Sequence, residues 1–62
     1  MANFIEIEKD GKAILLNCNL INYITPGENS ATYLYLVKDN PFNISYLTVP
    51  KKYSAVKDDI LL

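Results

Sequence analysis

The stretch that most constrains this chain runs from residue 31 to residue 38 and reads Ala-Thr-Tyr-Leu-Tyr-Leu-Val-Lys. Its apolar side chains alternate with a period of two, which is the period of a β-strand. It contains no glycine or proline and is rich in aromatic residues, which favour strands. One face of this strand carries Leu34 and Leu36, and the other carries Tyr33, Tyr35 and Val37. A strand that is apolar on both faces needs two covers, of which the rest of the chain can supply one and another molecule the other.

The length of the chain limits how much stability its own core can supply. Sixty-two residues predict a single domain spanning 1–62, whose core contributes roughly 3–5 kcal/mol. The single Cys18 excludes an internal disulfide, and without histidine we expect no zinc or iron–sulfur site. Half of the residues are hydrophobic, which indicates a folded chain. Self-association is therefore the remaining source of support, and we expect a homo-oligomer.

The charge and the terminal sequence argue against several classes of protein. The net charge is −1 and all six basic residues are lysines, whereas nucleic-acid-binding proteins usually present a basic, arginine-containing face. The N-terminal residues do not resemble a signal peptide, and the apolar runs are far too short to span a bilayer. We therefore expect a cytoplasmic protein without membrane contact. The abundance of lysine, asparagine, isoleucine and tyrosine is typical of AT-rich bacterial or phage genomes.

The first third of the chain predicts a β-hairpin. Phe4–Glu8 alternates isoleucine with glutamate, and Asp10-Gly11 suits a two-residue type I′ turn. That turn places Ile7 opposite Ile14 and Ile5 opposite Leu16, so the four apolar side chains share one face. The asparagines on either side of Cys18 then predict a bulge or tight turn.

The rest of the chain predicts three more strands and a helix. Strands are expected over 20–25, 31–38 and 44–49, with a type II turn at Pro26-Gly27 and a hairpin loop over 39–42. Ser54–Leu62 predicts a short helix with Ser54 as its N-cap. The fold class is thus mainly β, with a five-stranded, largely antiparallel sheet or half-open barrel and one short C-terminal helix. The expected core consists of Ile5, Ile7, Ile14, Leu16, Leu34, Leu36, Leu47, Val56 and Ile60.

Residues for catalysis are scarce. Without histidine there is no imidazole base, and nothing basic lies near Cys18 in sequence, so this cysteine is interpreted as a packing residue. Glu6 and Glu8 point to the same side of a strand, where solvated edge charges are the ordinary interpretation and an acid–base pair is only weakly indicated. We therefore expect no enzyme, and neither a catalytic, a cofactor nor a metal site.

All five tyrosines lie between positions 23 and 53. Pairing Lys38 with Asn43 across a four-residue loop places Tyr35 opposite Tyr46 and Tyr33 opposite Thr48. The resulting patch consists of Tyr33, Tyr35, Val37, Ile44 and Tyr46. Three interpretations remain open: a core covered by the C-terminal helix, a protein interface, or a platform for stacking nucleic-acid bases. In the last of these, the phosphates would be bound by Lys38, Lys51 and Lys52.

The order of these signals resembles the small flagellar FlbD-like family. The resemblance rests on Phe4–Glu8, Asp10-Gly11, Ile14-Leu-Leu-Asn17, Asn19-Leu-Ile21, Ala31–Val49 and Ser54–Ile60. It implies a bacterial β-rich regulator or assembly factor without catalytic residues. The longer loops around Pro26 and Pro41, and the tyrosine patch, depart from the family's pattern.

Together these observations predict a non-enzymatic protein-interaction module that self-associates through a tyrosine-rich sheet face. The alternative is a nucleic-acid-binding regulator that uses tyrosine stacking and scattered lysines.

Overall fold

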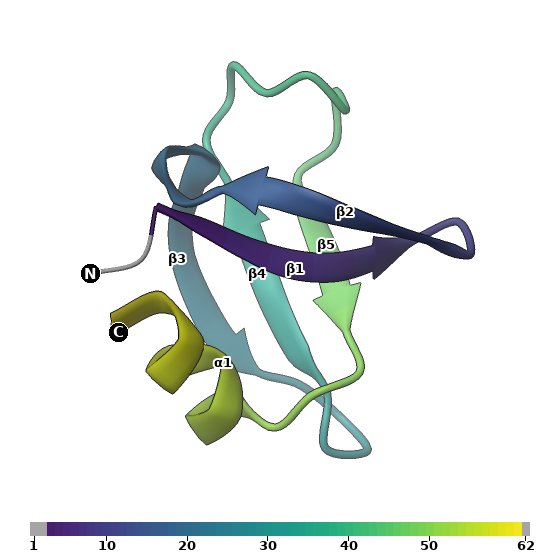
Figure 1. Ribbon diagram of the computed structural model, residues 1–62, viewed down its shortest axis with the longest axis vertical. Coiled ribbons are helices and arrows are strands. Elements are labelled where there is room, and N and C mark those ends of the chain that lie inside the picture. The colour runs from purple at the N-terminus through teal and green to yellow at the C-terminus, as the bar shows by residue number, and fades with distance from the viewer. Residues whose placement is uncertain (1–2, 62) are drawn as a thin grey trace.

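The computed structural model describes residues 3–61, which form five strands, one 3₁₀ helix and one α-helix (Figure 1). The elements are β1 (Phe4–Lys9), β2 (Lys12–Asn17), η1 (Cys18–Leu20), β3 (Ile21–Pro26), β4 (Thr32–Leu36), β5 (Tyr46–Val49) and α1 (Tyr53–Leu61). β1 and β2 form a two-stranded antiparallel sheet, and the other strands form a three-stranded antiparallel sheet in the order β3-β4-β5. The mainly β fold class with one C-terminal helix is confirmed. The strands are divided between two sheets, however, and these do not close into a barrel.

The β1–β2 hairpin has the predicted turn and the predicted register. Asp10 has a φ of 53° and Gly11 a φ of 79°, the two positive values that a type I′ turn requires. Ile7 pairs with Ile14, and Ile5 pairs with Leu16. Local turn chemistry and the alternation of apolar residues therefore agree on this element.

The chain leaves the hairpin at the expected break after β2. The Asn17 side-chain oxygen accepts a hydrogen bond from the Asn19 N–H at 2.9 Å, which holds the single turn of η1. This turn redirects the chain into β3, so that the hairpin crosses over the three-stranded sheet (Figure 1). The core lies between the hairpin and this sheet.

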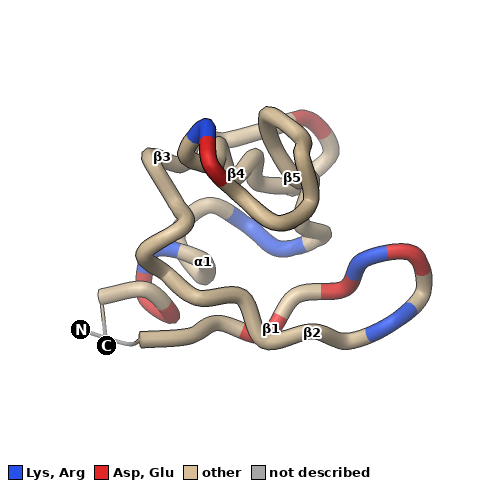
Figure 2. Tube along the Cα trace, turned by 90° about the horizontal axis from the view of Figure 1, so that it is seen from above, with Lys and Arg blue, Asp and Glu red and all other residues tan. Residues whose placement is uncertain are grey.

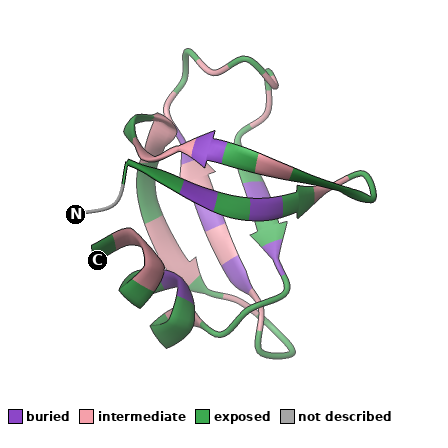
Figure 3. Cartoon of the chain, in the orientation of Figure 1, coloured by how far each residue is buried: buried purple, intermediate pink, exposed green. Residues whose placement is uncertain are grey.

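Burial alternates along β4 (Figure 3). Leu34 and Leu36 are buried in the core, whereas Tyr33 and Tyr35, on the opposite face, are partly exposed. The predicted core residues either are buried or, in the case of Ile14 and Ile60, pack against the core while partly exposed. Val49 and Thr32 are buried as well, which the sequence did not predict. The buried side chains are Ile5, Ile7, Leu16, Thr32, Leu34, Leu36, Leu47, Val49 and Val56.

The predicted type II turn at Pro26-Gly27 is wrong. Gly27 does not have a positive φ; the chain reverses instead at Asn29 (φ 55°) and Ser30 (φ 61°), where the Ala31 N–H donates to the Glu28 carbonyl at 3.0 Å. The cause is that Pro26 still belongs to the β3–β4 ladder, in register with Thr32, so the reversal comes later in the chain.

The β4–β5 hairpin has its predicted register, but its two strands separate before they reach the predicted loop. Tyr35 pairs with Tyr46, Leu34 with Leu47, and Tyr33 with Thr48, as expected. The predicted pairing of Lys38 with Asn43 is wrong. The Val37 N–H donates to the Leu20 carbonyl at 2.8 Å, which draws the chain toward β3.

The Asn40 side chain holds the loop between β4 and β5 together. The Asn40 Nδ2 donates to the main-chain carbonyls of Val37 and Ile44, both at 2.8 Å. β4 therefore ends at Leu36 and β5 begins at Tyr46, both inside the predicted bounds of these strands.

The helix begins before Ser54, so the prediction of Ser54 as N-cap is wrong. After Pro50 the chain turns tightly, with the Lys51 N–H donating to the Val49 carbonyl at 2.8 Å. The first helical hydrogen bond then joins the Val56 N–H to the Lys52 carbonyl at 3.1 Å. The predicted last residue, Leu62, lies outside the described residues.

The helix α1 packs on the core side of the molecule. Val56 is buried in the core and Ile60 packs against it. The helix therefore leaves the tyrosine face uncovered, which excludes the interpretation of that face as a covered core. No helix within residues 3–61 is long and apolar enough to cross a membrane.

Candidate interaction site

The outer face of the three-stranded sheet carries two rows of side chains. The first row, across β3, β4 and β5, is Tyr23, Tyr35 and Tyr46, and the second is Thr25, Tyr33 and Thr48. We call these six residues the tyrosine face. None is charged, and the three strands themselves contain no charged residue (Figure 2). The face is therefore a neutral surface of aromatic rings and hydroxyl groups.

The rings of the first row stack on one another. The centroids of Tyr23 and Tyr35 lie 4.7 Å apart with an interplanar angle of 7°, and those of Tyr35 and Tyr46 lie 5.4 Å apart at 27°. Because β4 lies between β3 and β5, both faces of the Tyr35 ring are covered by neighbouring tyrosines. The row thus presents ring edges, and not the flat face of Tyr35, to its surroundings.

The ring of Tyr33 completes the cluster from the second row. It meets Tyr46 at 5.5 Å and 64°, and Tyr35 at 6.5 Å and 81°, both in edge-to-face geometry. Such aromatic pairs contribute about 0.5–1.5 kcal/mol each beyond their buried area. Tyr23 and Tyr46 remain 52% and 49% exposed. The face is therefore held in shape by its own rings while much of it stays in contact with solvent.

A glycine supports the free side of the Tyr33 ring. A Cβ atom on Gly27 would lie 2.9 Å from Cε1 and 3.0 Å from Cζ of Tyr33, closer than real contacts allow. The backbone of the β3–β4 loop therefore serves as a flat support for this ring. This explains a glycine at a position where the backbone has no positive φ.

Gly27→Ala is expected to displace the Tyr33 ring and disturb its edge-to-face contacts. We expect changed ring-proton shifts for Tyr33 and Tyr46 and a loss of about 1 kcal/mol, because the lost aromatic contacts outweigh the entropic benefit of alanine. Glu28→Ala, at the next and exposed position, should leave both the shifts and the stability unchanged. Unmoved tyrosine shifts in the Gly27 variant would contradict the supporting role.

The structure gathers three of the predicted interface residues in the tyrosine face: Tyr33, Tyr35 and Tyr46. Val37 and Ile44 are half-buried at one end of the face, where they line a groove of about 520 Å³ together with Tyr23 and Tyr35. Ile44 also packs against the core. These two side chains therefore form the border of the face.

Sequence reasoning missed Tyr23 as a member of this face. Ile21 pairs with Leu36 on the core side, yet Tyr23 pairs with Tyr35 on the outer side, because a bulge at Asn22 shifts the register. A signal was present after the bulge: Tyr23, Ile24 and Thr25 alternate in the same way as Tyr33, Leu34 and Tyr35.

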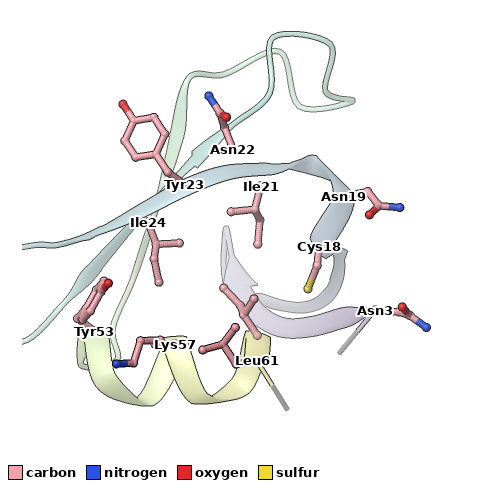
Figure 4. Close-up of a pocket in the computed structure, with 11 residues that line it drawn as sticks. Asn3, Cys18, Asn19, Ile21, Asn22, Tyr23, Ile24, Tyr53, Lys57 and Leu61 are labelled. Carbon is pink, nitrogen blue, oxygen red and sulfur yellow. The ribbon is translucent and has the colours of Figure 1, made fainter. Parts of the chain in front are cut away.

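A second groove, of about 400 Å³, lies between β3 and α1 (Figure 4). Ile21 and Ile24 face it from the sheet, Leu61 from the helix, and the Cys18 thiol from η1. Burial raises the pKa of this thiol, so it is protonated at neutral pH and a weak nucleophile.

The acidic side chains do not form a site. Glu6 and Glu8 are exposed on the outer side of β1. Within residues 3–61, no group of three or more histidine, cysteine or acidic side chains is placed to hold a metal ion.

Comparisons with known proteins identify no relative of this chain. No protein-family model, curated protein or solved structure matches the chain. The resemblance to the flagellar FlbD-like family therefore stays a prediction.

Proposed function

We propose that this protein is a non-enzymatic interaction module that self-associates through its tyrosine face. The observation that carries the proposal is a sheet face of six uncharged side chains that the helix does not cover, with Tyr23 and Tyr46 about half exposed. On composition we propose a bacterial or phage origin and a cytoplasmic location.

A second copy of the chain is a suitable partner because the face is neutral. Two such faces can be brought together without burying an unpaired charge, which would cost several kcal/mol. Two sheets pack face to face at a spacing of about 10 Å, with side chains interdigitated. Because the rings already hold one another in place, little side-chain entropy is lost on contact.

The area of the face sets the strength of the association. A tyrosine carries about 150–250 Å² of surface, so the exposed parts of Tyr23 and Tyr46 together offer roughly 200 Å² per copy. Even with the other four residues included, a face-to-face pair buries less than the ~1,200 Å² of a standard stable interface. We therefore propose weak self-association, with a Kd between roughly 1 µM and 1 mM.

The geometry does not favour the nucleic-acid alternative. Base stacking needs an exposed aromatic face, and because both faces of the central Tyr35 ring are covered, only the end rings Tyr23 and Tyr46 could offer one. Lys51, one of the expected phosphate ligands, instead lies 3.1 Å from Asp59 in an ion pair. A protein interface makes better use of tyrosine edges and hydroxyl groups.

The test is the mass of the protein in solution as a function of concentration. By sedimentation equilibrium from 10 µM to 1 mM, we expect the average mass to rise from one copy toward two. Tyr46→Ser removes a half-exposed ring from the edge of the face and should weaken this association at least tenfold. Leu15→Ser removes a side chain that is 69% exposed on the other sheet and should leave the association unchanged. A monomer at 1 mM, or equal effects of the two variants, would refute the proposal.

A further inference from the structure

The free edge of β5 presents main-chain groups that no other part of the described chain pairs with. The Leu36 N–H donates to the Ser45 carbonyl at 2.9 Å. Because antiparallel ladders alternate, Leu47 also bonds to β4, while the N–H and C=O groups of Tyr46 and Thr48 point away from it. We call this side of Tyr46–Val49 the β5 edge.

Apart from its short length, the β5 edge lacks the features that protect sheet edges. Its four residues include no charge, no proline and no bulge, which are the usual means of preventing strand addition. The opposite edge, on β3, also has no charge, but it has a bulge next to Ile21, ends in Pro26 and lies beside α1. A further strand can therefore be added at the β5 edge of the sheet, whereas the β3 edge is obstructed.

The β1–β2 hairpin extends past β5 on the core side of the sheet, as two views at right angles show (Figures 1 and 2). Two hollows of about 520 Å³ each lie along its length. The first is lined by Ile7, Ala13, Val49 and Pro50 together with the charged Glu6, Glu8 and Lys51. The second, near the hairpin turn, is lined by Ile14 and Phe42 together with Lys9, Asp10 and Lys12. A strand added to the β5 edge would thus have the hairpin on one side.

We propose that the β5 edge binds one extended peptide segment of a partner protein as an additional strand. The N–H and C=O groups of Tyr46 and Thr48 would form its main-chain hydrogen bonds. Alternate side chains of the peptide would point toward the hairpin, where the hollows offer apolar side chains bordered by acidic and basic ones. The side chains between them would extend the tyrosine face, where uncharged groups fit.

The position of the hairpin favours a peptide over a second copy of the chain as the occupant of the β5 edge. A second copy aligned edge to edge, with its tyrosine face on the same side, would bring its own projecting hairpin into the space that the first hairpin occupies (Figure 1). A single extended segment has no such obstruction. The occupant we assign is therefore a peptide, and this site is distinct from the face-to-face contact proposed above.

The probe for this site is a blocked peptide with the sequence of β4, flanked by lysines for solubility. The residues of β4 already complement β5 on its other side, so their alternation matches the requirement. The matched control is the same peptide with N-methyl groups on alternate residues, which remove the hydrogen bonds of one edge. Titration calorimetry and amide exchange are the measurements.

Thr48→Pro removes one outward N–H and leaves the bonds to β4 intact, because proline is tolerated where the N–H of an edge strand faces solvent. We expect the peptide to bind wild type and Thr48→Val, and to bind Thr48→Pro at least tenfold more weakly. The N-methylated peptide should not bind. In wild type, the peptide should slow exchange of the Tyr46 amide, whereas the Leu47 amide is slow without it.

Three outcomes would overturn the assignment. They are equal binding of the peptide to Thr48→Pro, absence of binding to wild type at millimolar concentration, and an unchanged exchange rate at Tyr46. If Thr48→Pro alters the mass of the protein in solution while Thr48→Val, which also replaces the side chain on the tyrosine face, does not, a second copy occupies the edge and the peptide assignment is wrong. Because Tyr46→Ser keeps the main chain, loss of self-association in that variant leaves this proposal untouched.

Discussion

Leu34→Ala is expected to leave the chain largely unfolded at 25 °C. Leu34 lies in the middle of β4 and is fully buried between the two sheets. Truncating such a leucine costs about 2–5 kcal/mol, which approaches the roughly 3–5 kcal/mol that a core of this size supplies. Far-ultraviolet circular dichroism and urea titration would show the loss directly.

The matched control for this prediction is Leu15→Ala. Leu15 is 69% exposed on the outer side of the hairpin, so the same substitution there should change the stability by less than about 0.5 kcal/mol. A Leu34 variant with the urea midpoint of wild type would show that the described core does not stabilise the fold.

Thr32→Val is expected to lower the melting temperature substantially, although the two side chains have nearly the same size. Thr32 is fully buried, and its hydroxyl donates to the Lys51 carbonyl at 2.7 Å. Valine cannot donate, so the carbonyl loses its partner at a cost of about 1–3 kcal/mol. At about 4–8 °C per kcal/mol for a domain of this size, the shift should be measurable by calorimetry.

The same hydrogen bond ties the segment before α1 to the start of β4. We therefore expect the amides of α1 to exchange faster in Thr32→Val, while those of the β1–β2 hairpin change less. Thr48→Val makes the identical substitution on the exposed tyrosine face and should leave the melting temperature nearly unchanged. Equal melting temperatures for the two variants would contradict the role of Thr32.

The parts of the fold that sequence predicted correctly are those fixed by local chemistry. Asp10-Gly11 determines the hairpin turn, and the turn determines the pairing of Ile7 with Ile14. The alternation of leucine and tyrosine in β4 likewise indicates which face is buried, because a slip of one residue would exchange the faces.

The parts that sequence predicted wrongly depend on contacts between distant residues. The β3–β4 loop turns at Asn29 and Ser30 because Pro26 still pairs with Thr32, and Gly27 then lies against the Tyr33 ring without a positive φ. Ser54 fails as N-cap because the turn at Pro50 starts the helix earlier.

The candidate site was partly accessible from the sequence. Cross-strand pairing alone brings Tyr33, Tyr35 and Tyr46 together, since their register follows from the alternation of side chains. The addition of Tyr23 required the bulge at Asn22, and the covering of the Tyr35 ring required side-chain positions. Nothing local in the sequence indicates that the hairpin extends past the β5 edge, which follows from how the two sheets cross.

The order of the strands has a consequence for how fast the chain folds. Every ladder joins strands that are consecutive in sequence, β1 with β2, β3 with β4, and β4 with β5. The loops between them close at a modest entropic cost, and β proteins whose strands pair with their neighbours in sequence fold faster than those with long crossovers. The hairpin and the three-stranded sheet can each begin to form alone, so we expect the packing of one on the other, which buries Leu16 and Leu34, to set the rate. The tyrosine face is complete as soon as the three-stranded sheet has formed, because none of its residues comes from the hairpin or the helix.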